Sequence, residues 1–149
     1  MTHTIRIASA LIVAAGFASA PASAATLDII LVEHADSDKV TDTGEKGDSV
    51  GDILTFNDEV LENGKPAGRD NGWCVRTVVG KVWECTWTTM LADGQIVVQG
   101  QFLDAGDSTL TVTGGTGNYL GASGEMKLHS RNDKGTEYDF VFHLTRSTQ

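Results

Sequence analysis

Three consecutive segments within residues 95–130 alternate apolar with polar or small residues. A period of two places every second side chain on one face of a strand, whereas an amphipathic helix needs a period of 3.6. The positions that share a face are Ile96, Val98, Gly100 and Phe102, then Leu110 and Val112, then Met126 and Leu128. The segments therefore predict three strands with apolar stripes toward a common interior. Between them, residues 113–117 (Thr-Gly-Gly-Thr-Gly) predict a tight corner, because so much glycine is unusual inside a strand.

The same alternation recurs along the rest of the chain. We expect strands at residues 26–34, covered on both faces because both are fairly apolar, and at residues 52–57 and 136–144. Residues 73–91 predict a β-hairpin that turns near Gly80 and Lys81, whereas the polar stretches 36–48 and 58–71 predict loops. Seven or eight short strands in one domain predict an all-β sandwich or barrel. We favour the barrel slightly, because closure removes exposed strand edges.

The first residues have the composition of a secretory signal peptide. Arg6 precedes an apolar run at residues 7–20, and Ala22-Ser23-Ala24 matches a small-residue cleavage site. We expect residues 1–24 to be removed and residues 25–149 to form one domain, secreted to the periplasm or the extracellular space. The alternative is an uncleaved anchor, but the run is shorter than the roughly 20 apolar residues of a membrane-spanning helix. No membrane span is expected after cleavage.

Charge and cysteine content narrow the class of partner and the compartment. The net charge of −9 argues against nucleic acid and anionic membranes, which bind Lys and Arg. Cys74 and Cys85 predict one disulfide in an oxidising compartment, with two unpaired buried thiols as the alternative. A two-residue hairpin turn would make them diagonal neighbours, and a four-residue turn would place them directly opposite. The same strand face would carry Arg76, Trp83 and Trp87.

Two patterns suggest chemistry that the rest of the chain does not support. Residues 47–51 (Gly-Asp-Ser-Val-Gly) match the nucleophile elbow of α/β-hydrolases, but that motif needs a strand-to-helix turn in a large sheet. The histidines His34, His129 and His143 and the two cysteines lack the spacing of a zinc site. We expect no structural metal.

Glu33 is the most informative charged residue, because it ends an apolar strand face at a position where a leucine would be expected. A carboxylate there must be paired, hydrogen-bonded or neutralised by a raised pKa. The alternative is that the strand ends at Val32 and leaves Glu33 in water.

Several blocks of the sequence, in this order, resemble the allene oxide cyclase family, whose barrel is shared with dirigent proteins. The blocks are residues 48–56 (DSVGDILTF), 97–103 (VVQGQFL), 110–117 (LTVTGGTG) and 124–128 (GEMKL). The similarity runs from about Leu31 to Leu144. It implies a single eight-stranded antiparallel β-barrel around an apolar cavity, often trimeric in the plant enzymes. Those enzymes convert an unstable fatty-acid allene oxide into a cyclopentenone without a cofactor.

The resemblance also implies roles for individual residues. Glu33 falls on the catalytic glutamate, which stabilises positive charge that develops as the epoxide opens. The positions that fall on the cavity wall are Phe56, Cys74 and Phe102. Ala35 replaces the asparagine that binds a water in the family, and the loop near Asp42 lacks the proline that helps to hold this water. The oxygen-binding half of the site is therefore missing or rebuilt.

Arg76 is a third departure, because the family has an aliphatic residue at this position. We hypothesise that Arg76 points inward, pairs with Glu33 and gives the cavity a polar anchor for a carboxylate or carbonyl group. The alternative is an outward Arg76 bonded to a surface acid such as Glu84.

These inferences favour a secreted, cofactor-free cyclase or isomerase. Its partner would be a small hydrophobic molecule, fatty-acid-derived or polyketide-like, with Glu33 as the catalytic residue and Trp83 and Trp87 completing the wall. The alternatives are a non-catalytic barrel that binds a hydrophobic ligand or orients reactive species as dirigent proteins do, and a stable exported scaffold. The family also implies a possible homo-oligomer, a trimer by analogy.

Overall fold

The computed structural model describes residues 24–147, which form antiparallel strands and turns without a helix. The strands are β1 (Ala24–His34), β2 (Lys39–Thr41), β3 (Ile53–Glu62), β4 (Lys65–Val78), β5 (Val82–Leu91), β6 (Gly94–Leu103), β7 (Ser108–Gly117), β8 (Ser123–Ser130) and β9 (Glu137–Ser147). The predicted signal peptide lies outside the described residues except for Ala24, with which β1 begins. Within residues 24–147 there is no helix of the length and apolar character needed to cross a membrane.

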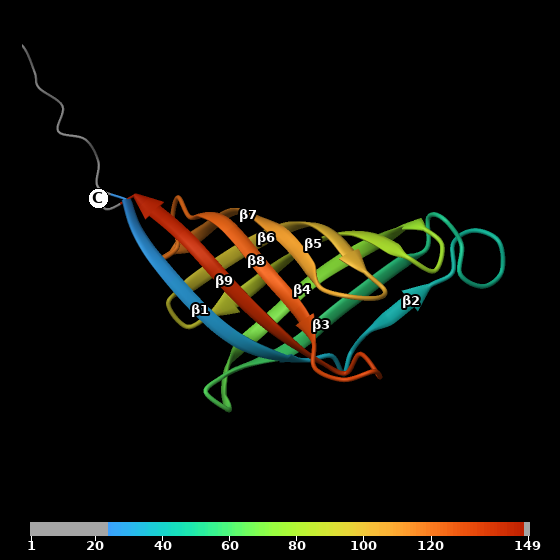
Figure 1. The fold of residues 1–149 in the computed structure, drawn as a ribbon, viewed down its shortest axis with the longest axis horizontal. Coiled ribbons are helices and arrows are strands. Elements are labelled where there is room, and N and C mark those ends of the chain that lie inside the picture. Colours follow the sequence, from blue (N-terminus) through green and yellow to red (C-terminus); the bar gives the residue numbers. More distant parts are fainter. Residues whose placement is uncertain (1–23, 148–149) are drawn as a thin grey trace, which may run out of the picture.

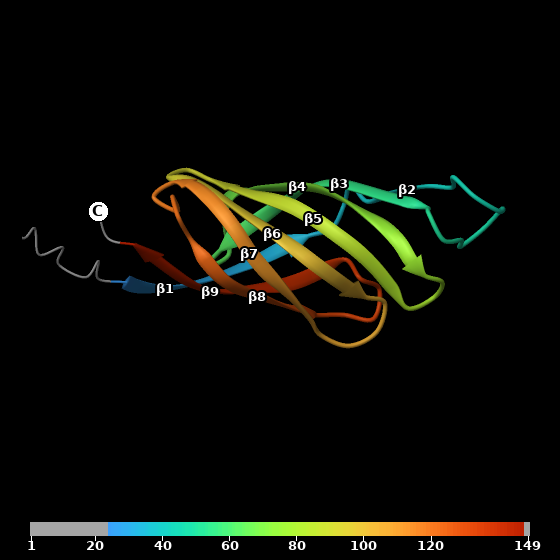
Figure 2. The same cartoon turned by 90° about the horizontal axis from the view of Figure 1, so that it is seen from above.

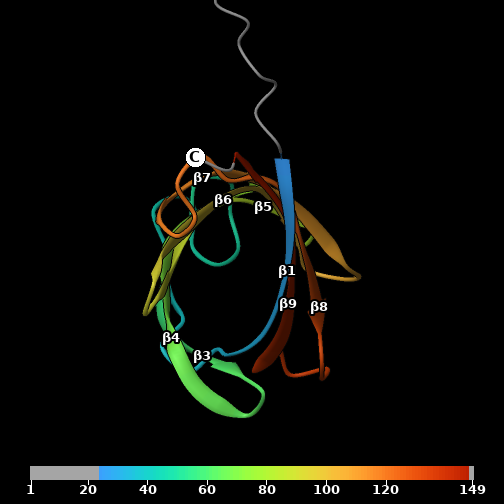
Figure 3. The same ribbon diagram turned by 90° about the vertical axis from the view of Figure 1, so that its left-hand side faces the viewer.

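The sheet closes on itself. Its strand order is β1-β9-β8-β7-β6-β5-β4-β3-β2, and β1 pairs in addition with the second half of β3. The eight long strands therefore form a closed ring, which is visible end-on in Figure 3. The short strand β2 pairs with the first half of β3 and extends with its loop beyond one end of the barrel (Figures 1 and 2). The predicted eight-stranded antiparallel β-barrel is confirmed.

The core lies inside the ring, where every second residue of each strand contributes a side chain. The apolar positions of the 95–130 segments fall on this inner face as predicted, and Ile96, Val98, Leu110 and Met126 are fully buried. Aromatic rings fill the middle of the barrel: the ring centroids of Trp87 and Phe140 lie 5.7 Å apart. Alternation of side chains across a strand thus accounts for the core without any helix.

The hairpin of β3 and β4 corrects the prediction of a loop at residues 58–71. The two strands continue through this stretch and turn only at Asn63 and Gly64, both of which have positive φ. Inward and outward positions continue to alternate past Phe56, but charged residues occupy many of these positions. In a sequence, such residues are typical of a solvated loop. The consequence is that Asp58 and Asp70 point into the barrel.

Two other expectations about the strands are wrong. Residues 113–117 belong to β7, and the corner follows at residues 118–122. Glycine is required within this stretch at Gly115, where an added Cβ would come within 2.6 Å of the Gln95 carbonyl oxygen. The outer face of β1 is open to solvent within the described part of the chain, because the side chain of Ile30 is 61% exposed.

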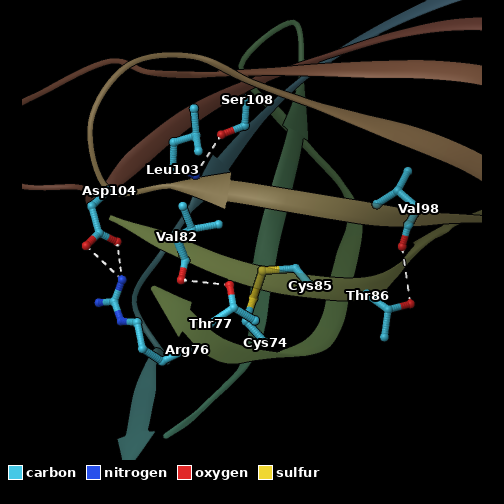
Figure 4. The surroundings of a disulfide bond; sticks show 10 residues. All are labelled: Cys74, Arg76, Thr77, Val82, Cys85, Thr86, Val98, Leu103, Asp104 and Ser108. Carbon is cyan, nitrogen blue, oxygen red and sulfur yellow. Dashed lines mark hydrogen bonds and ion pairs between the residues drawn. A yellow bond between two sulfur atoms is a disulfide. The ribbon is translucent and has the colours of Figure 1, made fainter. Parts of the chain in front are cut away.

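Cys74 and Cys85 form the predicted disulfide between β4 and β5 (Figure 4). They lie directly opposite each other, with Cα atoms 4.0 Å apart. The diagonal arrangement does not occur, because the turn between the paired residues Val78 and Val82 has three residues, 79–81, and the register shifts by one more residue between Arg76 and Val78. The hairpin thus contains a bulge in addition to its turn.

We expect the double variant Cys74→Ala/Cys85→Ala to lose about 2–3 kcal/mol of unfolding free energy, because the bond restricts the unfolded chain. Urea denaturation followed by tryptophan fluorescence measures the loss. Dithiothreitol serves as the control: it should destabilise the wild type by a similar amount and leave the variant unchanged. Equal stability of the oxidised wild type and the variant would contradict the prediction.

Candidate functional site

Three carboxylates from three neighbouring strands meet inside the barrel. Glu33 on β1 is 6% exposed, and Asp58 on β3 and Asp70 on β4 are fully buried. Asp58 and Asp70 are direct partners in the β3–β4 register, and Glu33 lies opposite Val60, two positions from Asp58. Strand pairing therefore brings the three side chains to one place, where one carboxylate oxygen from each lies within 4.8 Å of the others.

The hydrogen bonds of this cluster are incomplete. The Oδ1 atom of Asp58 accepts hydrogen bonds from the backbone N–H groups of Asp36 (3.2 Å) and Ser37 (2.8 Å). Among residues 24–147, neither Oδ2 of Asp58 nor either carboxylate oxygen of Asp70 has a fixed donor. A buried carboxylate without donors is costly, so the cluster requires protons or a ligand.

Burial raises the pKa of Glu33 well above its usual value, and the neighbouring Asp70 carboxylate adds to this effect. Burial also raises the pKa of Asp70 to about 6, against the hydrogen bond with Glu33, which lowers it. The interaction between the two carboxyl groups raises the pKa of Glu33 and lowers that of Asp70, which is the behaviour of a pair that can share one proton.

A fourth acid, Asp38, lies at the mouth of the barrel next to this cluster. Its side chain is exposed, yet burial of part of it raises its pKa to about 7, and the nearby Asp58 carboxylate adds to the shift. Burial likewise raises the pKa of Tyr138 to about 12, so its hydroxyl group remains neutral. The negative charge of the site therefore comes from the acids alone.

A small cavity lies beside Glu33 and Asp38. The other residues of its lining are Phe56, Cys74, Cys85, Trp87, Phe102, Leu128, Tyr138 and Phe140. Its volume of about 40 Å³ is enough for one or two water molecules, whereas small-molecule sites usually exceed roughly 300 Å³. The structure thus brings Glu33 together with the predicted wall residues Phe56, Cys74, Trp87 and Phe102, around a space too small for an organic molecule.

An open depression of about 680 Å³ adjoins this cavity at the same end of the barrel. It lies between the β6–β7 and β8–β9 loops and shares Phe102, Leu128 and Tyr138 with the cavity. The rings of Phe102 and Tyr138 pack edge to face, with centroids 5.9 Å apart. These two rings therefore separate the depression from Glu33. A depression of about 770 Å³ at the other end of the barrel contains none of the three buried acids.

The hypothesis that Arg76 pairs with Glu33 is wrong. Arg76 is buried, as expected, but its Nε atom lies 2.7 Å from Asp48, and its Nη1 atom lies 2.8 Å from both carboxylate oxygens of Asp104. Its guanidinium group also stacks over Trp83, 3.9 Å from the ring centroid. The loops after β2 and β6 bring these acids to Arg76 (Figure 4 shows Asp104). Arg76 and Trp83 are therefore absent from the lining of the cavity.

We expect Arg76→Met to lower the unfolding free energy by about 2–3 kcal/mol, because it leaves two partly buried carboxylates without their charged donor. Ligand binding in the cavity should not change. Arg131→Met is the matched control, since the ion pairs of Arg131 are exposed and should contribute less than about 1 kcal/mol. Chemical denaturation of both variants tests the difference, and equal losses would contradict it.

The three buried carboxylates are also the group that could hold a metal ion, because each offers a hard oxygen ligand. The histidines and cysteines that were considered for a zinc site are not part of this cluster. His129 and His143 bond to Asp107 and Asp28 on the outer surface, and the cysteines are consumed by the disulfide.

A scan against family models matches residues 31–142 to the allene oxide cyclase barrel-like domain. The chain belongs to this family. The allene oxide cyclase barrel-like fold is also found in the solved structures that resemble the chain, whereas a search of curated proteins gives no significant match.

Three solved structures illustrate the range of proteins with this barrel. A pyocyanin demethylase is 27% identical, with a TM-score of 0.68, and the match covers 78% of this chain and all of that one. The exo-specific intermolecular Diels-Alderase AbnU is 15% identical (TM-score 0.67; 83% and 98% coverage). The pterocarpan synthase dirigent protein PsPTS1 is 11% identical (TM-score 0.64; 85% and 97% coverage). The last two likenesses concern the fold alone.

Sequence reasoning found Glu33 but missed Asp58, Asp70 and Tyr138. A signal for the two aspartates was present, because Phe56, Asp58 and Val60 continue the period of two beyond the predicted strand end. The two aspartates were assigned to a loop because they are charged, although their spacing fits a strand. For Tyr138 the inward face was predicted correctly, but not its place at the mouth of the cavity.

Proposed function

We propose that this barrel catalyses a cyclisation or isomerisation of a small, largely apolar molecule, with Glu33 as the catalytic residue. One observation carries the proposal: Glu33 is buried beside a second buried carboxylate, Asp70, at the end of a cavity with aromatic walls. A carboxyl group whose pKa is raised well above its usual value suits a group that must both give and regain a proton.

The Glu33–Asp70 pair would act in two ways. The proton on Glu33 can be donated to a basic atom of the substrate and recovered when the reaction ends. The negative charge shared by the pair stabilises positive charge that develops on the substrate, and this effect is strong where water is excluded. The aromatic wall would fold the substrate so that its reacting atoms meet. Ala35 offers no side-chain polar atom, so Glu33 would have to polarise the substrate without the asparagine of the plant enzymes.

Substrate would enter from the open depression between the β6–β7 and β8–β9 loops. Rotation of Phe102 and Tyr138 away from each other would join this depression to the cavity and provide the missing volume. Ring rotations of this kind occur without backbone rearrangement. In this proposal, the small cavity corresponds to a closed state in which the rings of Phe102 and Tyr138 block the entrance.

The comparisons support a cyclase-type activity in coarse terms. The family is named for a cyclase, and one neighbour of the same fold is called a Diels-Alderase. Another is a dirigent protein, which supports the second candidate, a barrel that binds or orients a small molecule without catalysis. The disulfide fits an oxidising compartment, so we propose that the protein is secreted after cleavage of residues 1–24. The trimer implied by the resemblance stays a prediction.

The test begins with native mass spectrometry of the protein purified from its own host, to identify a retained small molecule. Incubation with this molecule should give a product, and Glu33→Gln should lower turnover at least about 100-fold with ligand affinity nearly unchanged. Glu125→Gln, an exposed change on the outside of β8, is the matched control and should retain full activity. Unchanged turnover in Glu33→Gln would remove Glu33 from the mechanism. A retained molecule that the wild type never converts would favour the non-catalytic barrel.

A further inference from the structure

We propose that the cavity selects small aromatic cations over neutral or anionic molecules of the same size. The inference rests on the proposed function in one respect, since it places the ligand in the same cavity. It adds the charge of the ligand, which the resemblance to a fatty-acid cyclase does not supply.

The ionisable groups around the cavity are acidic. Glu33 and Asp38 belong to its lining, and Asp58 and Asp70 lie directly behind Glu33, outside the lining. No lysine, arginine or histidine belongs to the lining formed by the described residues. Arg76 was the candidate anchor for a carboxylate, but its guanidinium group is engaged by Asp48 and Asp104. A carboxylate ligand would therefore be repelled, whereas a cation would be attracted.

Hydrogen-bond acceptors outnumber donors in the carboxylate cluster beside Glu33. Thr89 on β5 is directly opposite Asp70 in the β4–β5 register, is fully buried, and has no partner for its hydroxyl group among the described residues. The Oδ2 atom of Asp58 and both oxygens of Asp70 also lack fixed donors. The hydroxyl proton of Thr89 and a proton on Glu33 can satisfy at most two of these atoms. The remaining acceptors call for a ligand that carries positive charge or N–H donors.

The aromatic wall of the cavity favours an organic cation over a metal ion. The aromatic residues of the lining are Phe56, Trp87, Phe102, Tyr138 and Phe140. The faces of such rings attract organic cations, which also gain from burial against them. A calcium ion would use only the oxygens and prefers six to eight of them, yet the cluster brings together one oxygen from each of three carboxylates. Aromatic walls beside an acidic end therefore favour an aromatic cation.

The experiment compares three probes of nearly equal shape: N-methylpyridinium, toluene and benzoate. Isothermal titration calorimetry at pH 7.5 and low salt should give an affinity for N-methylpyridinium at least tenfold higher than for toluene, with no binding of benzoate. Asp70→Asn should weaken N-methylpyridinium at least tenfold and leave toluene unchanged. Thr89→Val, which alters no charge and lies outside the lining, should weaken the cation less than Asp70→Asn does, and circular dichroism verifies that both variants fold. Glu125→Gln should alter none of the three affinities.

Equal affinity for toluene and the cation, binding of benzoate, or binding of none of the probes would overturn the inference. So would tight binding of Mn²⁺ that displaces N-methylpyridinium, because the acids would then belong to a metal site. A failure of this inference can be distinguished from a failure of the proposed function. Glu33-dependent turnover of a neutral molecule, without any preference for cations, would support the proposed function and overturn the inference about ligand charge. Cation preference without any turnover would support the inference about ligand charge and contradict the proposed catalysis.

Discussion

Raising the pH from 4 to 8 is expected to lower the unfolding free energy, by about 3 kcal/mol through Asp70 alone. Burial raises the pKa of Asp70 from 3.8 to about 6, and each pH unit of such a difference is equivalent to about 1.4 kcal/mol. The unfolded chain releases this proton near pH 4, whereas the folded protein retains it until about pH 6. The stabilisation is therefore complete below pH 4 and is lost as the pH rises through 6. Glu33, whose pKa is raised well above its usual value, extends the loss to higher pH.

Urea denaturation at half-unit pH intervals measures this slope. The double variant Glu33→Gln/Asp70→Asn should remove the contribution of these two acids to the slope and should be more stable than the wild type at pH 8, because both replacements are neutral. The contribution of Asp38, whose pKa is raised to about 7, should remain. Glu125→Gln should retain the slope. His129 contributes in the same direction, because its hydrogen bond to Asp107 raises its pKa, so His129→Asn separates that exposed pair from the buried acids. A wild-type stability that stays flat or rises between pH 4 and 8 would contradict the assignment.

The acids with lowered pKa values change the unfolding free energy outside the range from pH 4 to 8. Hydrogen bonds from the backbone N–H groups of Thr43 and Ser49 lower the pKa of Asp52, and hydrogen bonds from Asn118 and Tyr119 lower that of Asp93. Their stabilisation is present above pH 4 and is lost as the pH falls below it. The pH range from 4 to 8 therefore isolates the groups with raised pKa values, and the stability maximum should lie near its acidic end.

Gly72→Ala is expected to cost about 3 kcal/mol of unfolding free energy, although it adds a single methyl group. Gly72 lies between Phe56 and Trp87 across three strands. A Cβ atom there would come within 2.2 Å of the Cβ of Trp87 and within 2.6 Å of the Thr86 carbonyl oxygen. The backbone of β4 or β5 would have to move, and Trp87 would leave its place in the cavity wall.

Gly114→Ala is the matched control for this prediction. Gly114 also lies in a strand, β7, but no atom lies within 4 Å of an added Cβ, and neither glycine has a positive φ. We expect Gly114→Ala to change stability by less than about 0.5 kcal/mol. Thermal and urea denaturation of both variants measure the contrast. Similar stabilities would mean that the strands accommodate the methyl group, and that Gly72 is not required for the close approach of β4 to β5.

Local alternation was enough to predict most of the barrel. It assigned the inner faces of the segments at residues 95–130 and 136–144 and the hairpin that carries the disulfide, but it left open whether Glu33 points inward or into water. Each of these inferences depends on which side of a strand a residue occupies, which is a property of neighbours in the sequence. The same reasoning failed at Asp58 and Asp70, because it equates charge with solvent and these two charges are buried.

The sequence by itself determined that the chain forms strands, which face of each is apolar, and that a carboxylate ends the apolar face of the first. Only the tertiary structure decided which charges meet. Asp58, Asp70 and Glu33 come together through the pairing of β3 with both β4 and β1, and Arg76 meets Asp48 and Asp104 through two loops that approach it from distant parts of the chain. Contacts of this kind depend on barrel closure and register. An electrostatic partner is set by distance in space, and no local pattern in a sequence encodes that distance.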